Sequence, residues 1–198
     1  MNHNSRMDST PFSPFLGALT MLKPSLIPCV ASLVVSVGGL ASTATASDLP
    51  VARHMAVSGD ATVATPMIQA ALTYAAFWNT GDGAFAHRAL AADFTDRTLP
   101  SGRPQGVVGP LQASKAFRLA VPDLNAEVED LVVAGDRVSV RLHFRGHFTG
   151  QFGALQGAGQ TVDFQAFDLY RIADGRIAEN WHLEDNLSLM QQLGLVKR

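Results

Sequence analysis

The chain has little cysteine and little charge. Its 198 residues include one cysteine, Cys29, which excludes both a disulfide framework and a zinc site built on cysteine. Charged residues make up 16%, the net charge is −2, and lysine and arginine never form a block. A surface for nucleic acid or for an anionic membrane is therefore not expected. Apolar residues reach 47%, enough to bury the core of a folded domain.

The sequence patterns that hold a metal, a phosphate or a nucleophilic serine are also missing. There is no H-x-H or H-E-x-x-H spacing for a metal, and no G-x-S-x-G, Walker or G-x-G-x-x-G motif after a predicted strand. The glycine-rich stretch at 150–159 is typical of a loop. The sequence thus predicts neither a metal nor a cofactor.

The N-terminal segment has the pattern of an export signal. An uncharged apolar run at 25–40 follows Lys23 and precedes small residues that end in A-T-A at 44–46. This order predicts cleavage after Ala46. The run is shorter than the ~20 residues of a usual membrane span, although a retained anchor is the alternative.

The cleavage site and the patterns that follow it predict a signal peptide at 1–46, a flexible leader at 47–64 and a folded domain at 65–198. The mature protein is expected to be periplasmic or secreted, with no stable membrane insertion once the signal has been removed.

The rest of the chain predicts helices first and strands later. Thr65 and Pro66 are typical of an N-cap and a first helical position, and apolar residues then recur at helical spacing as far as Gly81. Further predicted helices cover 84–90, 109–120 and 186–193, and predicted strands cover 126–133, 138–145, 161–172 and 176–184. This order favours an α+β fold with helices on one face of a curved antiparallel sheet.

Several motifs, in order along roughly residues 66–195, resemble those of a known family. The segment FDLYRIADGRIAENWHLEDNLSLMQQLG at 167–194 is similar to the C-terminal signature of SnoaL-like polyketide (ester) cyclases, in which R-x-x-D-G-K/R-I-x-E-H-W-D precedes a helix ending Q-Q-L-G. FWNTGD at 77–82 and TGQF at 149–152 resemble two further motifs of that family. The resemblance implies that 65–198 is a SnoaL-like domain with a cone-shaped nuclear-transport-factor-2-like fold, usually dimeric, and an apolar pocket between sheet and helices. It also implies intramolecular aldol closure by one acid/base residue without a metal or cofactor.

The same resemblance implies which residues are catalytic. The family's acid/base aspartate corresponds to His182 here, whereas a histidine of characterised cyclases corresponds to Asp168, so the two residue types look exchanged. An imidazole is a natural base at neutral pH, and a carboxylate can orient it. His182 is therefore expected to be the base, with an apparent pKa between about 6 and 7.5, and Asp168 its orienting group. Asp185 is a third candidate, or else the N-cap of the last helix.

Strand periodicity leaves the orientation of His182 open. Ile177, Trp181 and Leu183 would share one face of a regular strand, which places His182 on the other face. If Trp181 faces the pocket, His182 does not. The family register favours His182 in the pocket.

Six further residues are candidates for contact with a substrate, and they are Asp96, Phe77, Trp78, Phe94, His147 and Phe164. Each also has an ordinary interpretation, namely a core position for the aromatic residues, a capped turn for Asp96 and a strand end for His147.

The sequence thus predicts an exported SnoaL-like cyclase or isomerase-type enzyme. It would abstract a proton next to a carbonyl of a small apolar compound, without cofactor, as a homodimer. Two alternatives stay open: a non-catalytic dimeric binder of small apolar molecules, and a hydrolase of epoxides or lactones on the same fold.

Overall fold

The structure is a computed structural model that describes residues 49–197. The predicted signal peptide at 1–46 lies outside these residues. In chain order the elements are β1 (His54–Ser58), α1 (Ala61–Thr80), α2 (Gly83–Ala89), β2 (Leu90–Asp96), α3 (Val108–Ala120), β3 (Asn125–Ala134), β4 (Arg137–Phe148), β5 (Gln151–Phe152), β6 (Leu155–Gln156), β7 (Gln160–Ala173), β8 (Arg176–Glu184) and α4 (Asn186–Gln192). None of the described helices has the length and apolar character needed to cross a membrane.

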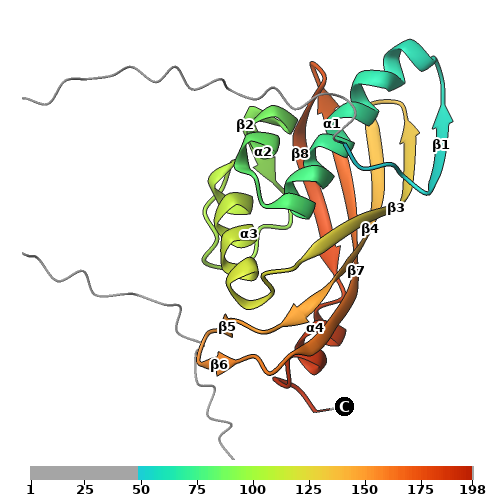
Figure 1. The fold of residues 1–198 in the computed structure, drawn as a ribbon. Helices are drawn as coiled ribbons and strands as arrows, with labels where there is room; N and C mark the ends of the chain where they lie inside the picture. Colours follow the sequence, from blue (N-terminus) through green and yellow to red (C-terminus); the bar gives the residue numbers. More distant parts are fainter. Residues whose placement is uncertain (1–48, 198) are drawn as a thin grey trace, which may run out of the picture. The chain divides into compact units, whose positions relative to one another are not determined.

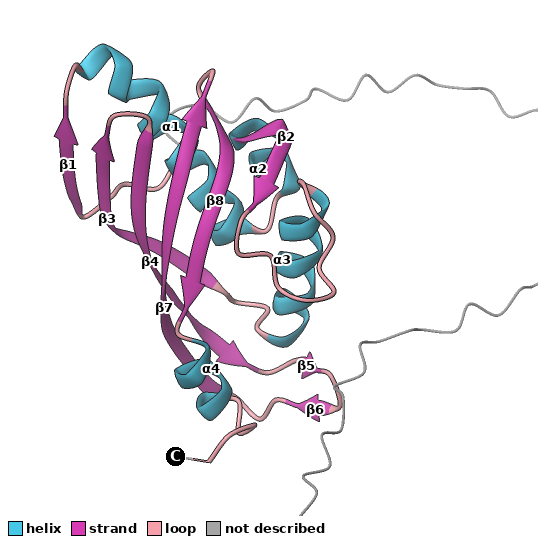
Figure 2. Cartoon of the chain, turned by 180° about the vertical axis from the view of Figure 1, so that it is seen from behind, coloured by secondary structure: helices cyan, strands magenta, loops and turns pink. Residues whose placement is uncertain are grey.

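Six strands form one sheet in the order β1-β3-β4-β7-β8-β2. Figures 1 and 2 show α1, α2 and α3 against one face of this sheet, with the short β5–β6 hairpin beyond its end. The central strands β3, β4, β7 and β8 pair antiparallel in chain order, as a meander. The predicted α+β class, with helices on one face of a largely antiparallel sheet, is confirmed.

Both edge strands differ from the predicted meander because they run parallel to their neighbours. β1 pairs with β3, and β2 pairs with β8. All five residues of β1 are exposed, so its position depends on backbone pairing rather than on an apolar pattern that the sequence could reveal. The segment 47–64, expected to be a flexible leader, therefore contains a strand and the first turn of α1.

Helix α1 begins five residues before the predicted start. Asp60 is its N-cap, and the Asp60 carboxylate accepts a hydrogen bond from the backbone N–H of Thr62. Pro66 consequently lies inside the helix instead of at its first position. A proline lacks the N–H that would bond back to Thr62, but Thr62 is exposed and water can reach its carbonyl group. The predicted end is correct, because Gly81 adopts the left-handed conformation with φ of 76°.

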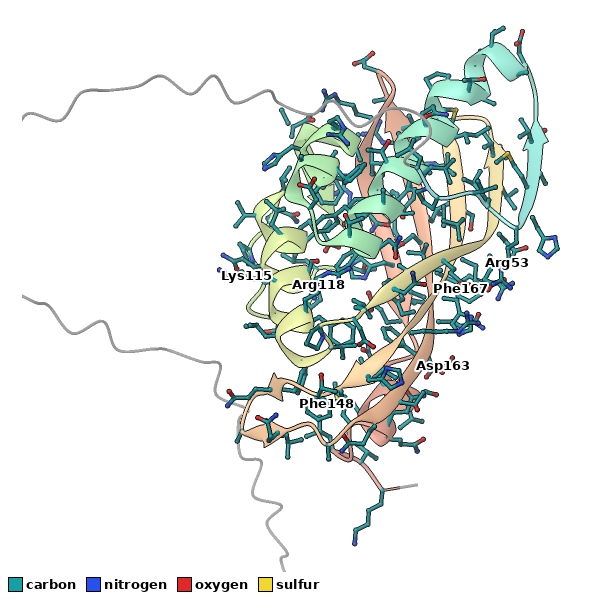
Figure 3. All side chains as sticks on the ribbon, in the orientation of Figure 1. Arg53, Lys115, Arg118, Phe148, Asp163 and Phe167 are labelled. Atoms are coloured by element: carbon teal, nitrogen blue, oxygen red, sulfur yellow. The ribbon has the colours of Figure 1, made fainter. Side chains whose placement is uncertain are left out.

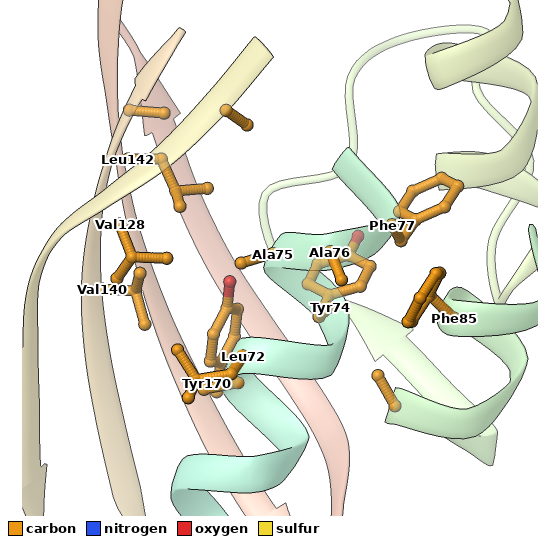
Figure 4. Packing of buried hydrophobic residues seen from close by; sticks show 14 of the residues in the cluster. Leu72, Tyr74, Ala75, Ala76, Phe77, Phe85, Val128, Val140, Leu142 and Tyr170 are labelled. Atoms are coloured by element: carbon orange, nitrogen blue, oxygen red, sulfur yellow. The ribbon is translucent and has the colours of Figure 1, made fainter. Parts of the chain in front are cut away.

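The core fills the space between α1 and the sheet. Figure 4 shows Leu72, Tyr74 and Ala75 of α1 facing Val128, Val140 and Leu142 of the sheet, with Tyr170 between them. All seven side chains are buried. Burial of each of the larger ones contributes roughly 1.5–3 kcal/mol to folding. This packing fixes α1 as one wall of the site described next.

Candidate functional site

A cavity of about 380 Å³ lies between the sheet, α1 and α3. This volume is within the range of binding sites for small molecules. Its walls are largely aromatic, formed by Tyr74, Trp78, Phe94, Phe117, Phe144, Phe152 and Phe164. Its polar lining consists mainly of Asp96, Arg103, Asp168, Asn180, His182 and Glu184.

Strand β8 supplies three of the polar residues. Asn180, His182 and Glu184 alternate along β8 and all line the cavity, whereas Leu183 is exposed on the opposite face. The pairing of β7 with β8 shifts register at a bulge next to Ile177. Because a bulge changes the phase of the alternation, Ile177 is buried on the same side as His182 although Trp181 is not. The structure therefore places His182 in the cavity.

Strand β2 brings Asp96 to His182. The pairing of β2 with β8 also contains an irregularity, between Leu90 and Thr95, and Phe94 and Asp96 both line the cavity. The backbone of Asp96 is held by the side chain of Gln105, which accepts from its N–H at 2.7 Å and donates to its carbonyl oxygen at 2.9 Å. One carboxylate oxygen of Asp96 accepts from the N–H of Thr98, and the other lies 3.0 Å from His182 Nε2.

His182 is held between two carboxylates. Its Nδ1 lies 2.7 Å from Glu184 Oε1, and its Nε2 lies 3.0 Å from Asp96 Oδ2. Burial lowers the pKa of His182, but the hydrogen bonds and charges of Glu184 and Asp96 outweigh burial and raise this pKa to about 9. This value lies above the range of about 6 to 7.5 expected for His182 as the base. At neutral pH the ring is an imidazolium, which donates protons rather than accepts them.

Asp168 has a different set of partners. It is the cross-strand neighbour of His182, but its carboxylate accepts from the Tyr170 hydroxyl at 2.9 Å and from Asn180 Nδ2 at 3.2 Å. Burial raises the pKa of Asp168 to about 6, and the hydrogen bond from Tyr170 and the charge of His182 limit the rise. His182 is thus oriented by Asp96 and Glu184, and not by Asp168 as predicted.

Asn180 leaves one acceptor free at the cavity. Its amide nitrogen faces the Asp168 carboxylate, so its oxygen Oδ1 is the remaining polar atom. Oδ1 is buried and has no hydrogen-bond partner among residues 49–197. A buried acceptor without a partner costs about 1–3 kcal/mol, which a hydroxyl group of a ligand can recover.

The other predicted site residues divide into two groups. Trp78, Phe94 and Phe164 line the cavity together with Asp96, Asp168 and His182. Three do not line it. Phe77 is buried in the core beside Phe85, because its position on α1 is rotated by about 100° from that of Trp78. His147 is exposed, and its Nδ1 lies 2.7 Å from Asp123 Oδ2. Asp185 is the N-cap of α4 and binds the backbone N–H and hydroxyl of Ser188.

Sequence reasoning overlooked Asn180, Glu184 and Arg103. Alternation along β8 puts the first two on the same face as His182, since both lie two residues from it, but this pattern alone does not make them site candidates. Arg103 belongs to the irregular loop between β2 and α3. A loop has no regular alternation of residues from which the direction of a side chain could be predicted. The described residues contain no group of three histidine, cysteine or acidic side chains arranged to hold a metal ion.

The sequence and the fold are similar to those of known proteins. The SnoaL-like polyketide cyclase family matches residues 68–193. A proposed polyketide cyclase from Bacillus cereus ATCC 10987 is 40% identical, with a TM-score of 0.69 over 75% of this chain and 95% of that one. TsrD from Streptomyces laurentii is 26% identical, with a TM-score of 0.61 over 70% of this chain and 100% of that one.

A third similar structure is IdmH, a proposed polyketide cyclase from Streptomyces antibioticus. It is 28% identical, with a TM-score of 0.58 over 65% of this chain and 98% of that one. No curated protein matches the sequence. The family match covers more than half of the chain, and the similar structures share its nuclear-transport-factor-2-like arrangement of helices on a curved sheet. The chain therefore belongs to the SnoaL-like polyketide cyclase family.

Proposed function

We propose that the protein catalyses acid/base chemistry, without a cofactor, on a small apolar carbonyl compound. The reaction is removal of a proton next to the carbonyl, followed by intramolecular aldol closure or by isomerisation. Membership of the family supports a cyclase or isomerase type of function. The observation that carries the proposal is a pair of ionisable groups in one cavity, Asp168 and His182, whose surroundings drive their protonation states apart at neutral pH.

Asp168 is the base in this proposal. Its pKa of about 6 leaves the carboxylate ionised at neutral pH. Because this pKa is close to 7, the carboxylate also accepts a proton more readily than an ordinary aspartate does. Tyr170 and Asn180 each donate one hydrogen bond to it and so fix its position. Each carboxylate oxygen can accept a second bond, which leaves room for the proton taken from the substrate carbon.

His182 stabilises the negative charge that this step creates. When the proton leaves the carbon, charge develops on the carbonyl oxygen as an enolate. Both N–H groups of the imidazolium are bound to carboxylates, so the ring stabilises this oxygen through its positive charge, which is already held in place and needs little reorganisation. Asp96 and Glu184 keep the ring protonated and fixed in orientation, so they act through His182 as positioning residues.

The aromatic walls complete the site. Phe144 and Phe164 stack with their ring centroids 5.0 Å apart, and Phe117 packs edge-on against Phe164. These rings hold an apolar ligand over the polar residues and reduce its contact with water. A low local polarity also strengthens the attraction between an enolate and the imidazolium.

Two further parts of the proposal concern the whole protein. Export to the periplasm or the outside of the cell is supported by the sequence pattern at 1–46 alone. Binding of an apolar molecule without turnover is the second candidate function. It is favoured by His182, which replaces the aspartate of the family motif and whose two ring nitrogens already bind carboxylates.

Proton exchange separates the two candidates. The protein is incubated in D₂O with 2-tetralone, an apolar ketone, and loss of the signals of the protons next to the carbonyl is followed by NMR. We expect exchange faster than in buffer, and a fall of roughly 10²- to 10⁴-fold with Asp168→Asn. Asp174→Asn is the matched control, since Asp174 lies in an exposed turn and Asn tolerates its positive φ. Binding of 2-tetralone without exchange would favour the non-catalytic binder.

A further inference from the structure

Arg103 lies in the loop between β2 and α3 and lines the cavity. The aliphatic part of its side chain lies over the start of α3. A Cβ atom on Gly109 would be 3.4 Å from Arg103 Cγ and 3.5 Å from its Cδ. The backbone carbonyl of Pro104 requires glycine at this position, because the same Cβ atom would lie only 2.4 Å from its oxygen. The arginine stem lies beside the start of α3, at van der Waals distance from the position of that Cβ atom, and its side chain lines the cavity.

Arg103 differs from the other nine arginines among residues 49–197. Each of those nine has a partner within the described chain. Six form ion pairs with carboxylates, and these are Arg53, Arg97, Arg137, Arg141, Arg145 and Arg171. Two donate to backbone carbonyls, namely Arg118 and Arg176, and Arg88 lies over the ring of Phe85. Arg103 has no such partner in the described part of the chain.

The charge of Arg103 lowers the pKa values of two residues that line the cavity, Glu184 and Tyr74. Burial raises the pKa of Glu184, but the contacts with His182 and, to a lesser extent, the charge of Arg103 bring this pKa below its usual value. Arg103 likewise limits the rise in the pKa of Tyr74 that burial causes. The guanidinium thus acts on residues of both β8 and α1, which form different walls of the cavity.

The carboxylates of the cavity do not neutralise Arg103 directly. Asp96 and Glu184 are bound to His182, and Asp168 is bound to Tyr170 and Asn180. None of them forms an ion pair with Arg103. The N–H groups of the His182 imidazolium are both bound to carboxylates, whereas Arg103 is a half-buried cation beside aromatic walls whose N–H groups are left for a ligand.

We propose that Arg103 determines specificity by binding a carboxylate of the substrate, which is then an apolar carbonyl compound that also carries an acid group. The carbonyl part of this inference rests on the proposed function, whereas the carboxylate part rests on Arg103 alone. A guanidinium matches a carboxylate with two parallel N–H···O bonds, and apolar surroundings strengthen this pairing. The carboxylate bound to Arg103 fixes one end of the substrate, while its carbonyl end lies at Asp168 and His182.

Binding of a matched pair of probes tests this inference. 2-Naphthylacetate and its methyl ester have the same rings, but only the first carries a charge. With the wild-type protein at pH 7.5, we expect calorimetry to show the carboxylate binding about 10- to 100-fold more tightly than the ester. Arg103→Gln is expected to bring this ratio close to one, and Arg103→Lys to leave an intermediate ratio. Arg97→Gln, which removes an arginine paired with Glu179 outside the cavity, is expected to keep the wild-type ratio.

Three results would overturn the inference: equal affinities of the wild-type protein for the two probes, no binding of the carboxylate up to its solubility limit, or a wild-type ratio in Arg103→Gln. The outcome is independent of the exchange experiment with 2-tetralone, which has no carboxylate. Carboxylate preference without exchange would contradict the catalytic proposal alone. Exchange without carboxylate preference would contradict the role of Arg103 alone.

Discussion

The polar residues of the cavity form two sets with opposite effects on protonation. In the first set, one imidazole lies between Asp96 and Glu184, and its positive charge is favoured. In the second set, the Asp168 carboxylate has two neutral donors, Tyr170 and Asn180, and its burial is only partly offset. A base and a cation therefore coexist in one cavity because their immediate partners differ in charge.

This difference predicts a bell-shaped pH dependence of proton exchange. Asp168 must be ionised to accept a proton, so kcat/KM should rise with pH through about 6. His182 must be protonated to stabilise the enolate, so kcat/KM should fall as pH rises through about 9. The measurement is the initial rate of exchange of 2-tetralone between pH 4.5 and 10.

His182→Gln provides the internal check. Loss of the imidazolium should remove the fall at high pH and lower the maximal rate. It should also move the rise at low pH upward, because the charge of His182 lowers the pKa of Asp168. A wild-type profile with a single rise between pH 6 and 7.5 and no fall at high pH would instead support His182 as the base.

At the scale of elements, the site depends on two irregularities and one close contact. The bulges in the pairing of β8 with β7 and with β2 aim His182 and Asp96 at the same space. The close contact lies at the other end of the cavity, where Gly150 donates its backbone N–H to the carbonyl oxygen of Ala120 at the end of α3. This contact holds the β5–β6 hairpin, and with it Phe152, against α3.

Gly150→Ala is expected to destabilise the protein by about 1–3 kcal/mol. A Cβ atom at this position would lie 1.9 Å from the carbonyl oxygen of Leu119, so the hairpin or the helix end must move. The measurement is urea unfolding followed by circular dichroism. Thr149→Ala, at the exposed neighbouring position, serves as the control and should unfold like the wild type. Stability of Gly150→Ala within 0.5 kcal/mol of the wild type, a difference typical of surface substitutions, would show that the contact does not constrain the hairpin.

At the scale of the whole described domain, the sheet face away from the helices carries apolar side chains. Across neighbouring strands, Val132, Leu169 and Trp181 lie in one row, and Phe167 and Leu183 lie side by side in the next. Leu183 is 74% exposed and Phe167 is 55% exposed. Figure 3 shows Phe167 on the sheet, away from Lys115 and Arg118 of α3. An exposed apolar patch of this kind is typical of an interface.

The expected homodimer would bury this face. Leu183→Glu places a charge in the patch and should convert the dimer to a monomer, because an unpaired buried charge is costly. The measurement is light scattering at micromolar concentration. Leu119→Glu, an equally drastic change at an exposed position of α3, should leave the dimer intact. A stable wild-type monomer would contradict the expected interface of about 1,200–2,000 Å².

The sequence by itself determined the α+β class, the order of the central strands and the family. These features depend on local signals, namely turn residues such as Gly135 and Gly175, alternation along each strand, and the continuous motif at 167–194. It also identified Asp96, Asp168 and His182 as candidates, which the fold brings to one cavity.

Only the tertiary structure decided which of these groups touch and therefore how each one ionises. Asp96 and His182 are 86 positions apart in sequence. The directions of their side chains are set by irregularities in strand pairing that the sequence pattern does not predict. Asp168 and His182 are cross-strand neighbours, yet they bind different partners. A pKa depends on burial and on the charges within a few ångströms, and both are properties of the packed chain rather than of the residue itself.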